Sequence, residues 1–303
     1  MKKIILVAGA TGNLGFRIVN FLLKNNADVR VVVRTKSNQE KVKELEHIGA
    51  TIYHIKNWNI EELKEACKDV SCVVSSLAGL REIIIDAQKV LLDAAIEVGV
   101  PRFIPSDYSL DFTPFSPGEN RNLDLRREFH QYLDSKPIAT TSIFNGAFTE
   151  LLTNEMPMIL FKQKLILYWG DKNHIWNFTT MDNTAAYTAR VALESSTPRY
   201  LSIAGDQISP QQVREMVSEV TKEKFKLFRP GGKALLGTMI KIIKFISPSE
   251  NELYPAWQGM QYMHNMIDER SEIKKLDNVR YPEIQWSTAK DIIVKHQTEN
   301  KKI

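Results

Sequence analysis

Three glycines near the start of the chain have the spacing of a phosphate-binding turn. Gly9, Gly12 and Gly15 follow the apolar run Ile4–Ala8 and open a segment with apolar residues at helical spacing. Glycine lets a backbone approach a pyrophosphate closely, and the N-terminus of the following helix offers free N–H groups and the positive end of its dipole. The turn therefore predicts a dinucleotide site, the alternative being glycines that serve only helix–strand packing.

The residues after the second predicted strand indicate which dinucleotide would bind. An acidic residue about 20 positions beyond the glycines hydrogen-bonds the ribose 2′-hydroxyl of NAD in such sites. Arg34 stands there instead and Lys36 follows it, and a guanidinium can bind a 2′-phosphate through paired, charge-assisted hydrogen bonds. We therefore expect NADP(H) to be preferred over NAD(H), unless both side chains are merely solvated loop charges.

Alternation of short β-branched runs with helical segments predicts the elements that must position these residues. Up to about residue 145 the strands are expected at 4–8, 29–33, 51–55, 72–75, 103–104 and 140–144, with helical patterns between them. This order predicts an α/β fold with a doubly wound parallel sheet. Gly99 followed by Pro101 is typical of a helix end.

Beyond residue 150 the pattern loses that regularity and predicts a second region. We expect residues 1–150 to form the nucleotide-binding domain and 151–303 a smaller α+β substrate region at the carboxyl edge of the sheet. Segments near 174–193 and 199–221 are expected to pack back on the first domain. The first should be a strand followed by a helix capped at Asp182, and Ser209-Pro210 should open the helix of the second.

Composition excludes several classes of protein. The 303 residues are 43% apolar and 25% charged, which is typical of a folded globular chain and not of a disordered one. The net charge of +4 comes without a recognition motif or a basic stripe, so we expect no direct binding to nucleic acid. No Gly-x-Ser-x-Gly elbow indicates a hydrolase.

The cysteines and histidines indicate neither a disulfide framework nor a metal site. Cys67 and Cys72 fit a reducing compartment, and the six histidines do not cluster at metal-ligand spacing. The longest late apolar stretch is interrupted by Lys241 and Lys244, so no membrane span is predicted. A cytoplasmic protein without a metal is expected.

Several of these features together resemble the NmrA-like and isoflavone-reductase-like branch of the atypical short-chain dehydrogenases. They are the turn at 9–15, Arg34, Asp93-Ala94-Ala95 and the stretch at 100–108. The resemblance covers about residues 1–150 well and is looser beyond. It implies a Rossmann domain that binds NADP(H) and, in many such proteins, reduction of small aromatic or quinone-like substrates. Others of similar sequence bind the nucleotide as non-catalytic redox sensors that act on a partner protein.

The resemblance also implies a set of cofactor-binding residues. The pyrophosphate would lie on the glycine turn, the 2′-phosphate on the two cations after the second strand, and the nicotinamide ribose on the loops after the fourth and fifth strands. In that order the residues are Gly9, Thr11, Gly12, Asn13, Leu14 and Gly15, then Arg34 and Lys36, then Ala78, Gly79, Pro105 and Ser106.

Two departures from the family pattern bear on the site. Relatives usually carry Gly-Asp after the third strand, where this chain has Lys56-Asn57-Trp58, so Asn57 is expected at the adenine amino group with Trp58 over the ring. Reductases of this group also carry a catalytic lysine on the helix after the fifth strand. The corresponding positions hold no lysine; they are Asn122, Leu123, Asp124, Leu125, Arg126 and Arg127.

The hydroxyl groups of Tyr132, Tyr108 and Ser106 are candidate proton donors. Tyr132 and Lys136 match the Tyr-x-x-x-Lys pair of ordinary short-chain dehydrogenases, but Pro137 places them at a helix end, where a lysine is favoured by the helix dipole alone. Tyr108 and Ser106 lie on the loop after the fifth strand, where ligands bind, so they are the candidates by position. A structural role is the more common one for such hydroxyls, and the catalytic residue stays unknown.

The late segment 231–266 is rich in apolar and flexible side chains that suit a flat hydrophobic ligand. Lys233, Lys241 and Lys244 give one of its helices a basic face, which is compatible with membrane-surface binding but more typical of a solvated face, so no membrane partner is expected. The sequence thus predicts an NADP(H)-dependent reductase of a small aromatic, quinone-like or conjugated carbonyl substrate. The alternative is a nucleotide sensor that binds a partner protein.

Overall fold

The computed structural model describes residues 2–153 and 158–300, and its main element is a parallel sheet of six strands. Along the sheet the order is β3-β2-β1-β4-β5-β6, so the chain winds outward twice from its centre. This confirms the predicted doubly wound fold. The strands are β1 (Ile4–Ala8), β2 (Asp28–Arg34), β3 (Thr51–Ile55), β4 (Cys72–Ser75), β5 (Arg102–Ile104) and β6 (Ala139–Thr140).

Helices cover both faces of the sheet, which explains why its inner strands are apolar without alternation. Ile5 and Val7 of β1 pack with α1 on one face, and Leu6 and Ala8 pack with α3 and α4 on the other. A π-helical turn, Glu82–Ala87, leads directly into α4. The helices are α1 (Asn13–Lys24), α2 (Gln39–His47), α3 (Ile60–Cys67), α4 (Gln88–Glu97) and α5 (Arg121–Leu133).

The predicted strand at 140–144 is wrong in one respect, because the chain forms two short strands there. β6 ends at Thr140 beside β5, and β7 (Ser142–Phe144) pairs in parallel with β12 (Tyr200–Ser202). The chain leaves the six-stranded sheet at this point to join a strand contributed from beyond residue 150. The break between β6 and β7 is therefore determined by β12, a hydrogen-bonding partner far along the chain.

The second region consists of two small sheets and four helices. One sheet joins β13, β11 and β8, the other joins β14, β10 and β9, and a third apolar core lies among them. The strands are β8 (Ala147–Phe148), β9 (Ile159–Leu160), β10 (Leu165–Leu167), β11 (Trp176–Thr179), β13 (Asp206–Ile208) and β14 (Lys226–Phe228). The helices are α7 (Pro210–Thr221), α8 (Lys233–Ile246), α9 (Ala256–Met266) and α10 (Ala289–Asn300).

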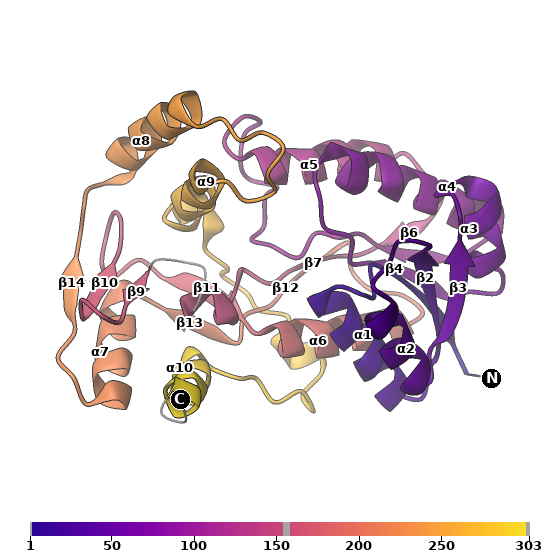
Figure 1. Cartoon of the computed structure of the whole chain (residues 1–303), viewed down its shortest axis with the longest axis horizontal. Coiled ribbons are helices and arrows are strands. Elements are labelled where there is room, and N and C mark those ends of the chain that lie inside the picture. The colour runs from indigo at the N-terminus through magenta and orange to yellow at the C-terminus, as the bar shows by residue number, and fades with distance from the viewer. Residues whose placement is uncertain (1, 154–157, 301–303) are drawn as a thin grey trace.

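Figure 1 shows the two regions side by side, with the six-stranded sheet and its helices on the right and β14, α7, α8 and α9 on the left. Helix α6 (Met181–Leu193) lies between them and packs along α1. Helix α7 packs instead on α10, β10 and β14. A domain boundary at residue 150 stays a prediction.

The helix ends show where the local sequence was sufficient to predict the cap and where it was not. Ser209 caps α7 with a capping box and Pro210 at its first position, and Gly99 has a φ of +77°, as predicted. The predicted cap at Asp182 is wrong, because Thr180 accepts the hydrogen bond from the Asn183 N–H. Asp182 pairs instead with Arg17 of α1, so its carboxylate is engaged between helices.

A buried polar network fastens β5, α5 and β7 to one another. The Asp107 Oδ2 atom lies 2.6 Å from His130 Nε2 and accepts a 2.6 Å hydrogen bond from the Ser142 hydroxyl, which in turn accepts one from Arg199. Burial raises the pKa of Asp107. Four effects lower this pKa by more than burial raises it: the charge of His130, its hydrogen bond, the hydrogen bond from the Ser142 hydroxyl and the charge of Arg126. The pKa therefore lies below its usual value. The folded state therefore favours ionised Asp107.

This network predicts a pH-dependent contribution to stability. Since the folded-state pKa of Asp107 is lowered, its stabilisation is complete above the unfolded-state pKa of about 4 and is lost as the pH falls through the folded-state value. We expect Asp107→Asn to lower the free energy of unfolding at neutral pH by about 2 kcal/mol, a loss that shrinks in acid. Urea unfolding at pH 7 and at about pH 2 measures it, since Asp107 loses its charge only below about pH 4, with exposed Asp86→Asn as the control. Equal losses at both pH values would contradict it.

Candidate functional site

The glycine turn is required first by packing. Gly9 has a φ of +84°, and a Cβ there would lie 2.6 Å from the carbonyl oxygen of Ser76. A Cβ on Gly15 would lie 2.3 Å from the Gly9 carbonyl oxygen and 2.5 Å from the Ser76 Oγ atom. Gly12 is exposed, and its Cβ would meet only the Gly9 carbonyl oxygen, at 3.2 Å. Packing thus accounts for two of the three glycines and leaves Gly12 facing outward.

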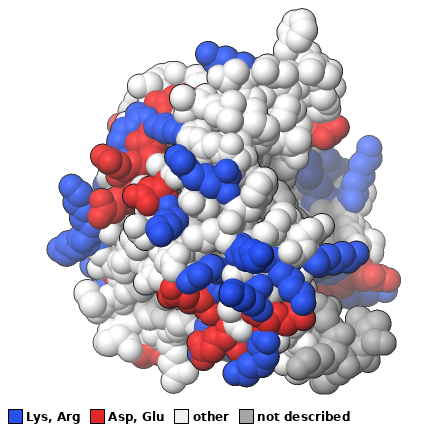
Figure 2. All heavy atoms as spheres, turned by 90° about the vertical axis from the view of Figure 1, so that its left-hand side faces the viewer, with Lys and Arg blue, Asp and Glu red and all other residues white. Residues whose placement is uncertain are grey.

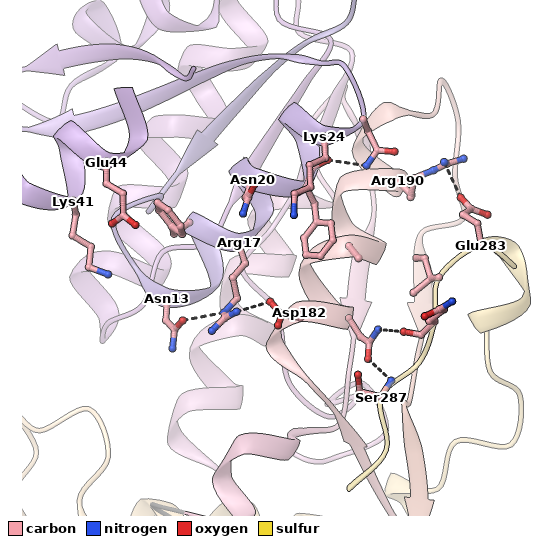
Figure 3. A pocket seen from close by; sticks show the side chains of 17 residues that line it. Asn13, Arg17, Asn20, Lys24, Lys41, Glu44, Asp182, Arg190, Glu283 and Ser287 are labelled. Atoms are coloured by element: carbon pink, nitrogen blue, oxygen red, sulfur yellow. Dashed lines mark hydrogen bonds and ion pairs between the residues drawn. The ribbon is translucent and has the colours of Figure 1, made fainter. Parts of the chain in front are cut away.

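The N-terminus of α1 fits an anion. Gly12 is the N-cap, no side chain caps it, and the first turn carries no acidic residue. Its first N–H groups are therefore free to bind a phosphate. Asn13 is exposed and accepts a 3.1 Å hydrogen bond from Arg17 Nε, so its side chain lies along α1 in the groove of Figure 3.

The two cations expected at a 2′-phosphate lie at the carboxyl end of β2. The Ser37 Oγ atom accepts a 3.1 Å hydrogen bond from the Arg34 N–H and holds the turn. Among the described residues, neither the Arg34 nor the Lys36 side chain has an ion pair or a hydrogen bond, and both are exposed. Lys41 of α2 lines the same groove as Asn13, which the sequence alone did not reveal (Figure 3).

The residues expected at the adenine lie at the carboxyl end of β3. The Asn57 side chain is exposed and donates to Glu62 Oε1 over 3.3 Å. The Trp58 indole N–H donates to the Ala87 carbonyl over 2.8 Å, which ties this loop to the π-helical turn. Their contact with a nucleotide base stays a prediction.

The loops after β4 and β5 are joined at the expected nicotinamide end. The Ser106 hydroxyl donates to the Leu77 carbonyl over 2.7 Å, and the Ser106 N–H donates to Gln88 Oε1 over 3.0 Å. Ala78 is exposed, Gly79 is partly exposed, and Pro105 is buried. The Tyr108 ring packs in the core beside α1 and α6, and burial raises the pKa of its hydroxyl well above the usual value. A catalytic role for either hydroxyl stays untested.

Positions 122–127, where the resemblance implies a catalytic lysine, contain a different set of groups. Arg126 Nε donates to the Ser106 carbonyl over 3.1 Å, so its guanidinium lies at the carboxyl end of β5. Arg126 also donates to the Asn122 carbonyl over 2.9 Å, and the buried Asn122 amide donates to the Leu253 carbonyl over 3.1 Å. Asn122 and Arg126 are one helical turn apart and face the second region.

Tyr262 of α9 completes this group from the far side. Its side chain lies close to the Asn122 side chain and to the charge of Arg126. Burial raises the pKa of Tyr262, while the charge of Arg126 and the nearby Asn122 side chain act to lower it. The sequence predicts only an apolar character for the segment 231–266 that contains Tyr262, because no spacing connects α9 with α5.

The Tyr132 and Lys136 pair lies elsewhere. Helix α5 ends at Leu133, and both side chains bind Asp93, the Tyr132 hydroxyl at 2.6 Å and the Lys136 ammonium at 3.0 Å. This confirms its predicted place at a helix end. In the described part of the chain no group of three or more His, Cys, Asp or Glu side chains is arranged to hold a metal ion. Every helix of the described residues is too short or too polar to cross a membrane.

Residues 1–290 match the NmrA-like family. The chain belongs to the NmrA-like family. Pinoresinol reductase 1 from Arabidopsis thaliana is 27% identical over 283 residues, which are 88% of this chain and 87% of the relative. This match extends the resemblance well beyond residue 150.

Two solved structures show the same fold. A structure from a study of pinoresinol-lariciresinol and phenylcoumaran benzylic ether reductases has a TM-score of 0.83 and 18% identity, covering 98% of this chain and 99% of the other. The binary complex of leucoanthocyanidin reductase with NADPH from Vitis vinifera has a TM-score of 0.80 and 17% identity, covering 97% and 99%. The NmrA-like chain thus shares its whole architecture with reductases.

The glycine geometry makes a prediction about stability. Gly15→Ala should lower the free energy of unfolding by about 2 kcal/mol, because its Cβ meets backbone atoms that cannot move without separating α1 from β1. Gly12→Ala is the matched control and should unfold within about 0.5 kcal/mol of the wild type. Denaturant unfolding of both variants compares them, and equal losses would show that the close contact at Gly15 does not constrain the fold.

Proposed function

We propose that this NmrA-like protein is an NADPH-dependent reductase of a small aromatic, quinone-like or conjugated carbonyl compound. The observation that carries the proposal is the uncapped N-terminus of α1, together with two cations at the end of β2 whose side chains have no ion pair or hydrogen bond among the described residues. The first suits a pyrophosphate and the second a 2′-phosphate. Family membership supports the same reading.

In this proposal the cofactor contacts follow the order of the strands. Backbone N–H groups of the turn from Gly9 to Gly15 bind the pyrophosphate, Arg34 and Lys36 bind the 2′-phosphate, and Asn57 and Trp58 contact the adenine. Ala78, Gly79, Pro105 and Ser106 line the nicotinamide ribose. Bound NADPH supplies a hydride to the acceptor.

The proton that balances hydride transfer is assigned to Tyr262. The acceptor carbon gains the hydride and its two electrons, and the acceptor oxygen takes the proton of the Tyr262 hydroxyl. Water then returns a proton to the tyrosinate. Arg126 stabilises the tyrosinate by its positive charge, and Asn122 holds the hydroxyl in place.

The second region supplies an apolar surface for the acceptor. Met260 and Tyr262 are partly buried against the third core, and Met263 lies within it. Flexible thioethers beside an aromatic ring suit a flat apolar molecule. A quinone-like acceptor can take its proton from water, so it depends less on Tyr262 than a conjugated carbonyl does. We place the reaction in the cytoplasm.

The second candidate function is a nucleotide-sensing regulator that binds a partner protein and turns nothing over. The absence of lysine from positions 122–127 favours it. A difference in affinity for NADP⁺ and NADPH, with nucleotide-dependent capture of a partner and no turnover, would support this function over the reductase.

Nucleotide titration tests the role of Arg34. We expect Arg34→Ala to weaken NADP⁺ binding about 30-fold and NAD⁺ binding by less than about threefold, because only NADP⁺ presents a phosphate to the guanidinium. Calorimetric titration of both nucleotides measures this. Arg214→Ala, on α7, is the control and should change neither affinity. Equal affinity of the wild type for the two nucleotides would refute the preference.

Steady-state oxidation of NADPH across quinones and enones tests the reaction itself. We expect Tyr262→Phe to lower kcat for an enone about a hundredfold and to leave quinone reduction within about threefold, since loss of a general acid matters only where water cannot replace it. Tyr53→Phe, on β3, is the control. No turnover with any acceptor, while NADPH is bound, would overturn the reductase in favour of the sensor.

A further inference from the structure

The positive charge of this chain is concentrated in one segment. Residues 224–249 contain six cations and no carboxylate, whereas the remaining chain has 34 Lys and Arg against 36 Asp and Glu. The entire net charge of +4 therefore originates here. The six residues are Lys224, Lys226, Arg229, Lys233, Lys241 and Lys244.

The same segment carries an unusual share of exposed apolar side chains. Leu236 and Ile240 are the buried residues of α8, and helical geometry places Ile242, Phe245 and Leu235 on the opposite side. Phe245 is 90% exposed and Ile246 is 74% exposed. Of the nine large apolar side chains exposed in the described chain, five lie between Phe228 and Ile246. Scattered exposed apolar residues are ordinary, but a contiguous helical face of them marks an interaction surface.

Lysines border this apolar face along one side. Lys233, Lys241 and Lys244 follow one another at helical spacing and line a shallow groove beside Glu119 and His264. Lys233 pairs with Asp268, and the Lys244 ammonium lies 4.9 Å from the centre of the Trp257 ring. Lys241 is exposed and has no ion pair among the described residues.

Figure 2 views the molecule from the side on which α8 and β14 lie in Figure 1. Its upper part is largely uncharged surface, with Lys and Arg side chains at its top edge and in a band below. Phe245 and Ile246 are close to the end of α8, which lies at the upper edge of the molecule in Figure 1. The apolar face of α8 therefore lies on the outer surface of the molecule.

Contrary to the expectation from the sequence, we propose that the outer face of α8 binds the surface of an anionic phospholipid bilayer. Ile242, Phe245 and Ile246 insert among the headgroups and the first methylenes, and Lys241 and Lys244 contact lipid phosphates. An apolar stripe bordered by lysines, on a helix without acidic residues, has the chemistry of an interfacial helix.

Charge and shape favour lipid over a second copy of the chain as the occupant. Pairing two copies of α8 through this face would bring two cationic segments together, which opposes association, whereas an anionic surface is complementary. A helix face on the outer surface of the molecule suits a planar partner. The proposal does not depend on the reductase activity.

Vesicle sedimentation tests the proposal with the whole protein. The wild type should bind vesicles that contain phosphatidylglycerol at least tenfold more tightly than vesicles of phosphatidylcholine alone, and salt should weaken that binding. Phe245→Ser with Ile246→Ser should lower the affinity at least tenfold. Lys241→Glu with Lys244→Glu should abolish the preference for anionic lipid.

The controls separate loss of lipid binding from loss of folding. Val279→Ser removes an apolar side chain that is 83% exposed outside this segment and should leave vesicle binding unchanged. The variants of α8 should keep the wild-type unfolding midpoint and nucleotide affinity. Failure of the wild type to sediment with anionic vesicles at low salt would overturn the proposal. So would a wild-type dimer that Phe245→Ser with Ile246→Ser converts to monomers, since α8 would then be an interface between copies.

Discussion

The close approach of α1 to β1 and the β4 loop is the constraint on which the candidate site depends. There is no room for a Cβ at Gly9 or Gly15, so the first turn of α1 lies directly on the backbone at the end of the sheet. This contact leaves the uncapped helix end, with Gly12 at its tip, facing outward at the carboxyl edge. An anion site thus follows from the way the helix packs, because packing aims the free N–H groups away from the core.

The junction between the two regions depends on polar groups that are removed from water. Asp107, His130 and Ser142 form one buried cluster, and Arg199, directly before β12, donates a hydrogen bond to it. Arg102 of β5 donates to the carbonyl groups of Val191 and Glu194 at the end of α6. The first contact ties the loop after β5, α5 and β7 to residues beyond 180, and the second does the same for β5. The second region therefore cannot shift without leaving buried polar groups unpaired.

At the carboxyl end of β5, the polar groups of the candidate site come from both regions. Arg126 reaches the end of β5 from α5, and Tyr262 reaches Asn122 from α9. A hydroxyl, a cation and an amide thus meet at the positions where the resemblance implies a lysine. A similar division holds for charge: the sequence has a small positive excess, and the structure places that excess beside exposed apolar side chains on α8.

Local sequence determined the elements whose signals are local. The alternation of strands and helices, the glycine turn, the Ser209 cap and the end of α4 at Gly99 all depend on residues a few positions apart, so they could be predicted. The tertiary structure decided the features that depend on contacts between residues far apart in the chain. β12 splits the predicted strand at 140–144, and Arg17 takes the carboxylate of Asp182 while Thr180 caps α6. Tyr262 meets Asn122, and the outer face of α8 stays uncovered, because packing partners far along the chain determine which side chains meet and which remain in water.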